Sequence, residues 1–213
     1  MVVAIQELLK TRALIKEEAT LRQKFEREAT VTNFEKGYVS APWINQEIDP
    51  NLQETAAQII AHYFRERGLT KITGIPNCGV PLATAVSQEM VLPLAPSRKG
   101  KEIPGAWRNP LVVEEEVPSF TTGKTSTFVF NNIFPQDHLL LVDDFCALGE
   151  TGINITTALL SQGVEVSYAV YAAKTFQGGF EKIRRLGVDV FYVVGIKEIT
   201  RGGHVILEPP HFS

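Results

Sequence analysis

Between residues 71 and 194, short apolar runs alternate with segments of helical character, and this alternation constrains the fold more than any other feature. The runs 138–142 and 188–194 are almost continuously apolar, as strands are when both faces of a parallel sheet are covered. The helical segments 151–162 and 180–186 are each followed by glycine, the residue that most readily ends a helix. The pattern predicts an α/β protein with a central, mostly parallel sheet flanked by helices.

The same reasoning assigns the remaining elements. Asp49 and Pro50 form a helix start, with an N-cap residue followed by proline in the first turn. The expected strands are 71–75, 91–95, 126–131, 138–142, 164–173 and 188–194. The expected helices are 4–28, 50–67, 80–89, 151–162 and 180–186, with an irregular stretch at 30–49. The predicted organisation is an N-terminal helical extension, residues 1–40, and a single domain, residues 41–213.

Composition excludes several classes of protein. The 213 residues include 21 Lys and Arg against 24 Asp and Glu, and this near-balance argues against a nucleic-acid-binding module that works through bulk positive charge. No apolar run approaches the roughly 18 residues of a membrane span, and charged residues interrupt the N-terminal segment where a secretory signal would be apolar. Two cysteines form no disulfide framework. We therefore expect a cytoplasmic protein with no membrane and no nucleic-acid partner.

Residues 139–152 read LLLVDDFCALGETG and carry the clearest chemical signal in the chain. An apolar strand delivers Asp143 and Asp144 to the edge of the sheet where ligands bind in such folds. The loop that follows contains Gly149 and opens into a helix, so backbone N–H groups can converge on an anion. Carboxylates suit hydroxyl groups or a divalent cation, and together with the anion loop they predict a sugar phosphate ligand.

This segment resembles the phosphoribosyl pyrophosphate (PRPP) motif of the type I phosphoribosyltransferases, which has four apolar residues, two acidic residues and a phosphate loop ending in Gly-x-Thr. Within that family the chain is most similar to the xanthine phosphoribosyltransferases. The similarity lies in patches at residues 44–50, 70–72, 77–79, 98–101, 119–121, 136–138, 143–145 and 174–177. The resemblance implies the type I fold, with a flexible active-site loop at 99–118, a small hood region and a homodimer.

The resemblance also assigns the PRPP-binding residues. Asp143 and Asp144 are expected to hold the ribose hydroxyls, and the loop at 77–79 is expected to hold the pyrophosphate through its backbone. The 5-phosphate would be wrapped by Ala147, Leu148, Gly149, Glu150 and Thr151, and the pyrophosphate loop consists of Asn77, Cys78 and Gly79. Mg²⁺ is the implied cofactor, bound mainly by PRPP's own oxygens, with the two aspartates as candidate protein ligands.

Two further groups of residues follow from the same resemblance. The basic residues Arg98, Lys99 and Lys101 match a stretch that reaches pyrophosphate, in some members across a dimer interface; Lys101 is expected to be catalytic together with Asp143 and Asp144. The residues expected to contact the base are Asn45, at the purine edge, Lys174, at the 6-oxygen, and Phe176, stacked on the ring.

The implied activity is transfer of ribose 5-phosphate from PRPP to a purine, with xanthine or another 6-oxopurine preferred. Lys174 favours an oxygen over adenine's amino group, because an ammonium group is a donor only. Adenine and orotate transferases, or a non-catalytic PRPP-sensing regulator of the same fold, are the alternatives. Three departures from the family's usual pattern are Leu148 in place of a hydroxyl residue, the carboxylate of Glu150 beside the phosphate, and Pro76 where an acidic residue is common.

Overall fold

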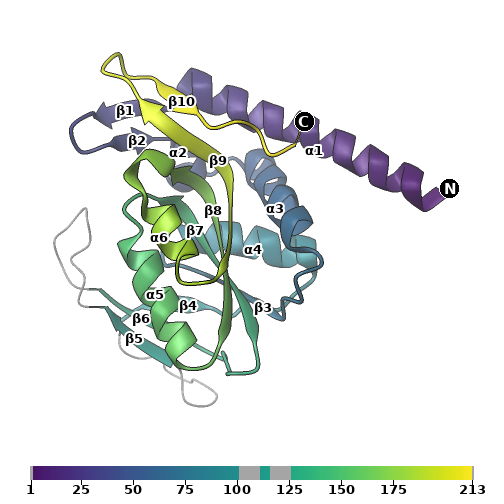
Figure 1. Ribbon diagram of the computed structural model, residues 1–213, viewed down its shortest axis with the longest axis vertical. Helices are drawn as coiled ribbons and strands as arrows, with labels where there is room; N and C mark the ends of the chain where they lie inside the picture. The colour runs from purple at the N-terminus through teal and green to yellow at the C-terminus, as the bar shows by residue number, and fades with distance from the viewer. Residues whose placement is uncertain (1, 101–110, 116–125, 213) are drawn as a thin grey trace.

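The computed structural model describes residues 2–100, 111–115 and 126–212. At its centre is a five-stranded sheet in the order β10-β9-β8-β7-β3, in which only β10 runs antiparallel to its neighbour (Figure 1). The strands span Lys71–Gly74 (β3), His138–Cys146 (β7), Glu165–Lys174 (β8), Asp189–Ile199 (β9) and Val205–Leu207 (β10). The predicted fold class, a mostly parallel sheet flanked by helices, is confirmed.

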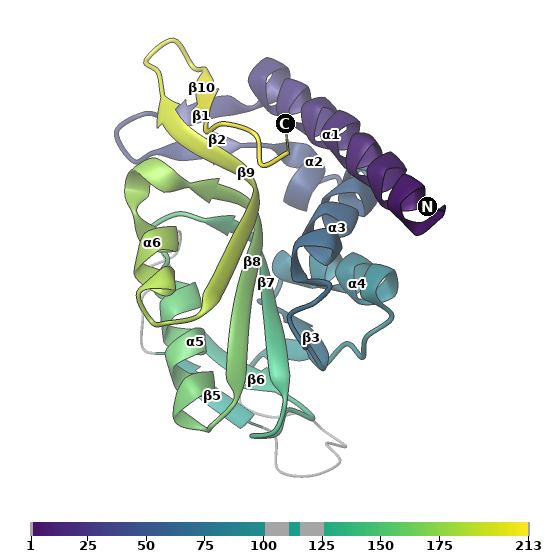
Figure 2. The same ribbon diagram turned by 45° about the vertical axis from the view of Figure 1, so that its right-hand side comes forward.

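Helices cover both faces of this sheet, as Figures 1 and 2 show from two directions. One face carries α3 (Pro50–Phe64) and α4 (Gly79–Met90), and the other carries α5 (Glu150–Ser161) and α6 (Gly179–Arg184). The side chains of β8 alternate between the two apolar cores that result. Tyr168 packs in the core beneath α5 and α6, whereas Tyr171 packs in the core beneath α3.

Helix α1 (Val2–Glu28) packs through its C-terminal half and extends away from the sheet at its N-terminus (Figure 1). Leu21 and Phe25 are fully buried against the core on the α3 side. The buried carboxylate of Glu18 accepts hydrogen bonds from the backbone N–H groups of His211, at 2.7 Å, and Phe212, at 2.9 Å. The C-terminal segment is therefore fastened to this helix.

The stretch 30–49, expected to be irregular, contains regular structure. Strands β1 (Thr30–Asn33) and β2 (Tyr38–Ser40) form an antiparallel hairpin, followed by the short helix α2 (Pro42–Asn45). Strand β1 is mostly exposed and β2 is half-buried, and at three or four residues each they are too short to show the apolar alternation that identifies a strand from sequence.

The prediction of a strand at 91–95 is wrong. Val91 adopts a left-handed conformation (φ 55°) that ends α4, and a single bridge between Leu94 and Ile72 is the only pairing found in this segment. The strand lies further on: β4 (Ser97–Lys99), β6 (Ser126–Phe130) and β5 (Leu111–Glu115) form a separate antiparallel sheet in the order β4-β6-β5. Strand β5 falls within the segment expected to be irregular, 99–118.

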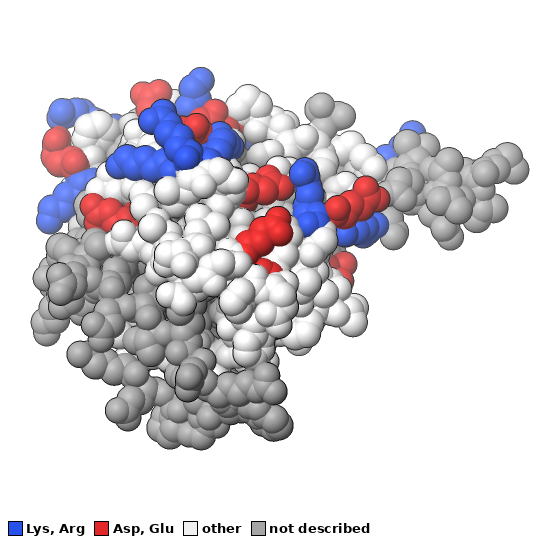
Figure 3. All heavy atoms as spheres, turned by 60° about the horizontal axis from the view of Figure 1, so that its bottom comes forward, with Lys and Arg blue, Asp and Glu red and all other residues white. Residues whose placement is uncertain are grey.

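Charged side chains of both signs intermingle on the face drawn in Figure 3. This arrangement agrees with the near-neutral net charge of the chain, and among the residues drawn in colour that face has no extended basic patch. Among the helices in the described ranges, none combines the length and apolar character that a membrane crossing requires.

Candidate active site

The first feature of the site is the junction between the ends of β3 and β7. The backbone N–H of Ile75 donates to the carbonyl of Val142 at 2.8 Å, so the loop after β3 continues directly beside the acidic pair. Gly79 is needed there, because a Cβ at this position would lie 2.5 Å from the Val142 oxygen and 2.9 Å from the Cα of Asp143. The structure therefore brings the predicted pyrophosphate loop, 77–79, against the predicted ribose-binding carboxylates.

Asp143 and Asp144 form an electrostatically unbalanced pair. The pKa of Asp143 is raised well above its usual range, first by burial and then by the neighbouring negative charge of Asp144. A hydrogen bond from the backbone N–H of Asp144, at 2.9 Å, opposes this rise in part. In the described part of the chain no basic side chain offsets the two effects on Asp143. The pair is arranged to receive donors or a cation from elsewhere.

The loop after β7 forms a pocket of about 120 Å³ at the start of α5. Its shape depends on two glycines in contact: Gly149 has a φ of 78°, and a Cβ on it would lie 2.8 Å from the Cα of Gly179. The N–H of Gly179 donates to the carbonyl of Ala147 at 3.1 Å. The pocket is lined by Asp143, Phe145, Cys146, Ala147, Leu148, Gly149, Glu150, Thr151, Gly152 and Tyr168. All five predicted 5-phosphate residues thus lie together around one cavity.

Glu150 carries the carboxylate that seemed incompatible with a phosphate. The residue is exposed at the first position of α5, so water screens its charge. Sequence reasoning overlooked two other contributors to this pocket, Tyr168 from β8 and Gly179 from α6. Gly178 and Gly179 form an adjacent pair in the sequence, and that pair was the available signal of a close backbone approach.

Two of the predicted base-binding residues surround Asp144. Asn45 donates from its side-chain nitrogen to Oδ2 of Asp144 at 2.6 Å. Lys174 is buried, and its ammonium donates to the carbonyl of Gly37 at 3.0 Å. Burial lowers the pKa of Lys174, while the charge of Asp144 opposes that shift. The structure therefore connects α2 and the β1–β2 turn to the acidic pair.

Phe176 lies on the other side of the β1–β2 turn residue Gly37, to which Lys174 donates. It is 40% exposed and lines a groove with Phe34 and Leu148, between the β1–β2 turn and the phosphate-loop pocket. A Cβ on Gly37 would lie 3.3 Å from the Phe176 ring, so the turn passes directly beside that ring. An aromatic face in this position is available for stacking on a planar ligand.

The side chains of the predicted basic stretch do not all point the same way. Arg98 and Lys99 are both exposed on β4, where consecutive side chains point to opposite faces. Burial and the charges of the two aspartates raise the pKa of Cys78 in the pyrophosphate loop. The charge of Lys99 opposes that rise, so Lys99 is the basic residue that acts on this loop. Lys101 lies outside the described residues.

The acidic side chains of the site suit a magnesium ion that takes ligands from both protein and substrate, and not an ion enclosed by protein ligands alone. Among the described residues there is no group of three or more His, Cys, Asp or Glu side chains able to hold a metal. Two adjacent carboxylates with an unbalanced charge suit Mg²⁺, which commonly takes one or two protein carboxylates and completes its shell with water and substrate phosphates.

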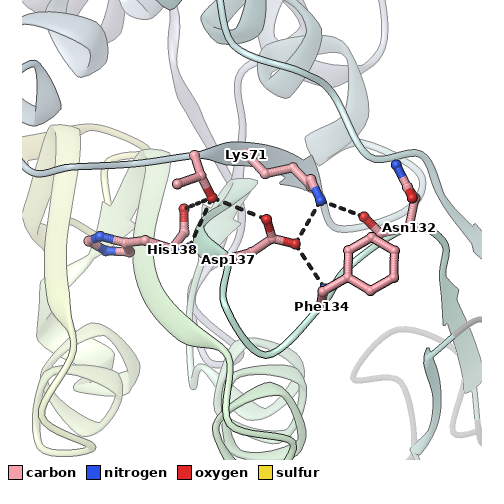
Figure 4. Close-up of polar contacts among 6 residues, drawn as sticks. Lys71, Asn132, Phe134, Asp137 and His138 are labelled. Carbon is pink, nitrogen blue, oxygen red and sulfur yellow. Dashed lines mark hydrogen bonds and ion pairs between the residues drawn. The ribbon is translucent and has the colours of Figure 1, made fainter.

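Two other patches that resemble the family, 70–72 and 136–138, meet at the opposite end of β3 and β7 (Figure 4). Lys71 donates from Nζ to Oδ2 of Asp137 and to the carbonyl of Asn132, both at 2.6 Å. Asp137 also accepts from the backbone N–H of Phe134 at 2.8 Å and from the hydroxyl of Thr70 at 3.2 Å. Both charges of this ion pair are satisfied internally, so the network holds the fold together.

Comparison with known proteins gives a consistent result. No protein-family model matches the sequence. The xanthine phosphoribosyltransferase of Agathobacter rectalis is 29% identical over 158 residues, which cover 73% of this chain and 81% of that protein. The enzyme of the same name from Bacillus licheniformis is 27% identical over 191 residues, covering 88% and 96%.

A solved adenine phosphoribosyltransferase from Trypanosoma brucei, in complex with AMP, pyrophosphate and ribose-5-phosphate, shares the fold. Its TM-score is 0.66 at 18% identity, over 82% of this chain and 79% of that one. At this identity the likeness concerns the fold alone. The sequence relatives and the fold together support the resemblance to the type I phosphoribosyltransferases: the chain is similar in sequence to the xanthine phosphoribosyltransferases and shares the fold of the solved adenine enzyme.

Proposed function

We propose that this protein transfers ribose 5-phosphate from PRPP to a 6-oxopurine, with xanthine the preferred base, and releases pyrophosphate. The observation that carries the proposal is the meeting of three parts at one sheet edge. These parts are the acidic pair at 143–144, the phosphate-loop pocket at 147–151 and the loop at 77–79. A ligand with a phosphate, vicinal hydroxyls and a pyrophosphate matches all three at once.

The proposed reaction requires no covalent enzyme intermediate. A purine nitrogen attacks C1 of the ribose and gives up its proton to water, the bond from C1 to the pyrophosphate oxygen breaks, and that oxygen keeps the electron pair. The protein contributes position and charge: Asp143 and Asp144 hold the ribose hydroxyls, and the phosphate loop holds the 5-phosphate. Lys99 lies near the loop that would receive the leaving group. Fixing the two reactants in this way accounts for much of the rate.

Magnesium fits this scheme. When bound, Mg²⁺ neutralises charge on the pyrophosphate as it departs, and the carboxylates of Asp143 and Asp144 are the protein groups available to it or to its water shell.

Base preference depends on Lys174. Its buried ammonium supplies donors and no acceptor, which favours a carbonyl oxygen at purine C6 over an amino group. The solved structures with this fold include adenine enzymes, but at 18% identity their base does not transfer to this chain. Against a purely PRPP-sensing role, Lys99 is placed to stabilise a leaving group, which a sensor does not require. We further expect a homodimer, as the family resemblance implies.

The test is a panel of xanthine, guanine, hypoxanthine, adenine and orotate, each with PRPP and Mg²⁺. Pyrophosphate release is measured alongside the loss of PRPP. We expect release with 6-oxopurines, greatest with xanthine. Turnover with adenine or orotate alone would contradict the base assignment, and PRPP binding without release on any base would favour the regulator.

A further inference from the structure

We propose that the phenol O–H of Tyr168 is a ligand of the sugar 5-phosphate, donating a hydrogen bond from the floor of the phosphate-loop pocket. This assignment rests on the proposed function, because it takes the phosphate of PRPP as the occupant of that pocket. It adds a residue from β8 to a site otherwise built from the loop after β7.

The position of the hydroxyl is fixed from two sides. Tyr168 is 1% exposed, and its O–H hydrogen-bonds with the thiol of Cys146, which lies at the end of β7. On the other side is the first turn of α5, where a Cβ on Gly152 would lie 3.1 Å from the phenol oxygen. Cys146, Gly152 and Tyr168 all line the same pocket. The hydroxyl is thus held beneath the first turn of α5, beside the phosphate-loop pocket.

The chemistry of the lining residues leaves the pocket short of side-chain donors. No lysine, arginine or histidine is among the described residues that line it. The hydroxyls of Thr151 and Tyr168 are therefore its strongest side-chain donors. A buried phenol normally satisfies its O–H with a good acceptor, yet the partner here is a thiol, which is a weak one. A phosphate oxygen is a far better acceptor for that proton.

The protonation state of Tyr168 favours this role. Its pKa is raised well above the usual value, first by burial and then by the nearby Cys146 and Asp143. The phenol therefore stays neutral and keeps its proton over the whole pH range in which an enzyme of this kind works. A neutral donor adds no charge to repel or attract other parts of the substrate, so its contribution goes to binding the phosphate.

The variant that tests the proposal is Tyr168→Phe, which removes one oxygen and keeps the ring. The chain offers a matched control in Tyr171→Phe, three residues along the same strand. Tyr171 is also fully buried, but it faces the opposite core and donates to the carbonyl of Leu52 at 3.1 Å. The two substitutions remove the same group from the same strand, and only one of the two hydroxyls reaches the pocket.

The readout is calorimetric binding of ribose 5-phosphate, which needs no purine and no turnover. We expect Tyr168→Phe to weaken binding about 10-fold or more, as the loss of a hydrogen bond to a charged group does, and Tyr171→Phe to leave it unchanged. Equal affinity in wild type and Tyr168→Phe would overturn the assignment, even where the variant unfolds at a lower temperature. Absence of binding to the wild type would instead overturn the proposed function, so the two failures are distinguishable.

Discussion

Strand β7 has one acidic residue just before it, Asp137, and another in its C-terminal half, Asp143, and the surroundings of the two are opposite in kind. Asp137, just before the strand, accepts hydrogen bonds from Lys71, Phe134 and Thr70. Asp143, six residues later, receives one backbone N–H and has a second carboxylate beside it. Both regions lie in patches that resemble the same family, but only Asp143 lies in the PRPP motif.

The difference shows how to separate a structural acid from a ligand-binding one. A buried charge that already has a cation and several donors contributes to the stability of the fold and has little left for a ligand. A buried carboxylate such as Asp143, which has a like charge and no cation beside it, costs stability in the free protein, and a ligand with hydroxyls or a metal ion relieves that cost. Each substitution below changes one of these acidic residues or one of their partners.

The largest effect is expected from Asp143→Asn combined with Asp144→Asn. Asparagine keeps the shape and removes the charges proposed to hold the ribose hydroxyls, so turnover should fall by about 10³-fold or more, equivalent to about 4 kcal/mol of transition-state stabilisation. Pyrophosphate release measures this, with circular dichroism as the check on folding. Near-wild-type turnover would show that this end of β7 is not the site.

At the other end of β7, Lys71→Met leaves the carboxylate of Asp137 without its cation. The free energy of unfolding should fall by about 3–5 kcal/mol, because a buried charge loses its partner, while the KM for PRPP stays within about twofold. Urea denaturation and steady-state kinetics below the unfolding transition measure the two quantities. A large rise in KM with unchanged stability would reverse the roles assigned to the two ends.

A smaller effect is expected from Asn45→Ala, which removes the hydrogen bond to Asp144 from α2. Loss of one hydrogen bond to a charged group should raise the KM for PRPP about 10-fold, since the free carboxylate is no longer held in position. Initial rates with PRPP and the base varied separately give both KM values. If only the KM for the base rises, Asn45 contacts the purine and does not position Asp144.

The smallest effect concerns stability and pH in the single variant Asp143→Asn. Because the pKa of Asp143 is raised in the folded state, the folded protein binds more protons than the unfolded chain, and stability falls as pH rises through that window. The variant has no carboxylate at this position and does not lose stability in this way. It should therefore be more stable than wild type near pH 7, and this difference in stability should shrink as pH falls. Urea midpoints between pH 4 and 8 measure it, and an advantage that grows toward acid would contradict the raised pKa.

Much of the site was predictable because its parts are contiguous in sequence. The segment 139–152 contains the strand, the acidic pair and the phosphate loop, and apolar runs such as 188–194 predict the strands of a mostly parallel sheet. A strand at 91–95 was wrong because Val91 and its neighbours are apolar in composition, while the chain there is leaving α4 in a left-handed turn.

Other features depend on contacts between distant segments. Asn45 meets Asp144 across 99 positions, and Tyr168 reaches the pocket because an alternating strand happens to present it on the α5 side. The structural role of Lys71, as distinct from the base-binding role proposed for Lys174, was equally hidden. Both are buried lysines next to strands, and only the completeness of their partners distinguishes them.

The most direct test of the account is the affinity for PRPP with Mg²⁺, measured by calorimetry on three proteins. These are the wild type, the double variant Asp143→Asn with Asp144→Asn, and Lys71→Met, which changes the structural end of the same strand. We predict that the double variant loses affinity by about 100-fold or more, while Lys71→Met binds as the wild type does. Equal binding by the double variant and the wild type would contradict the central claim that the unbalanced acidic pair at the end of β7 is the ribose-binding site.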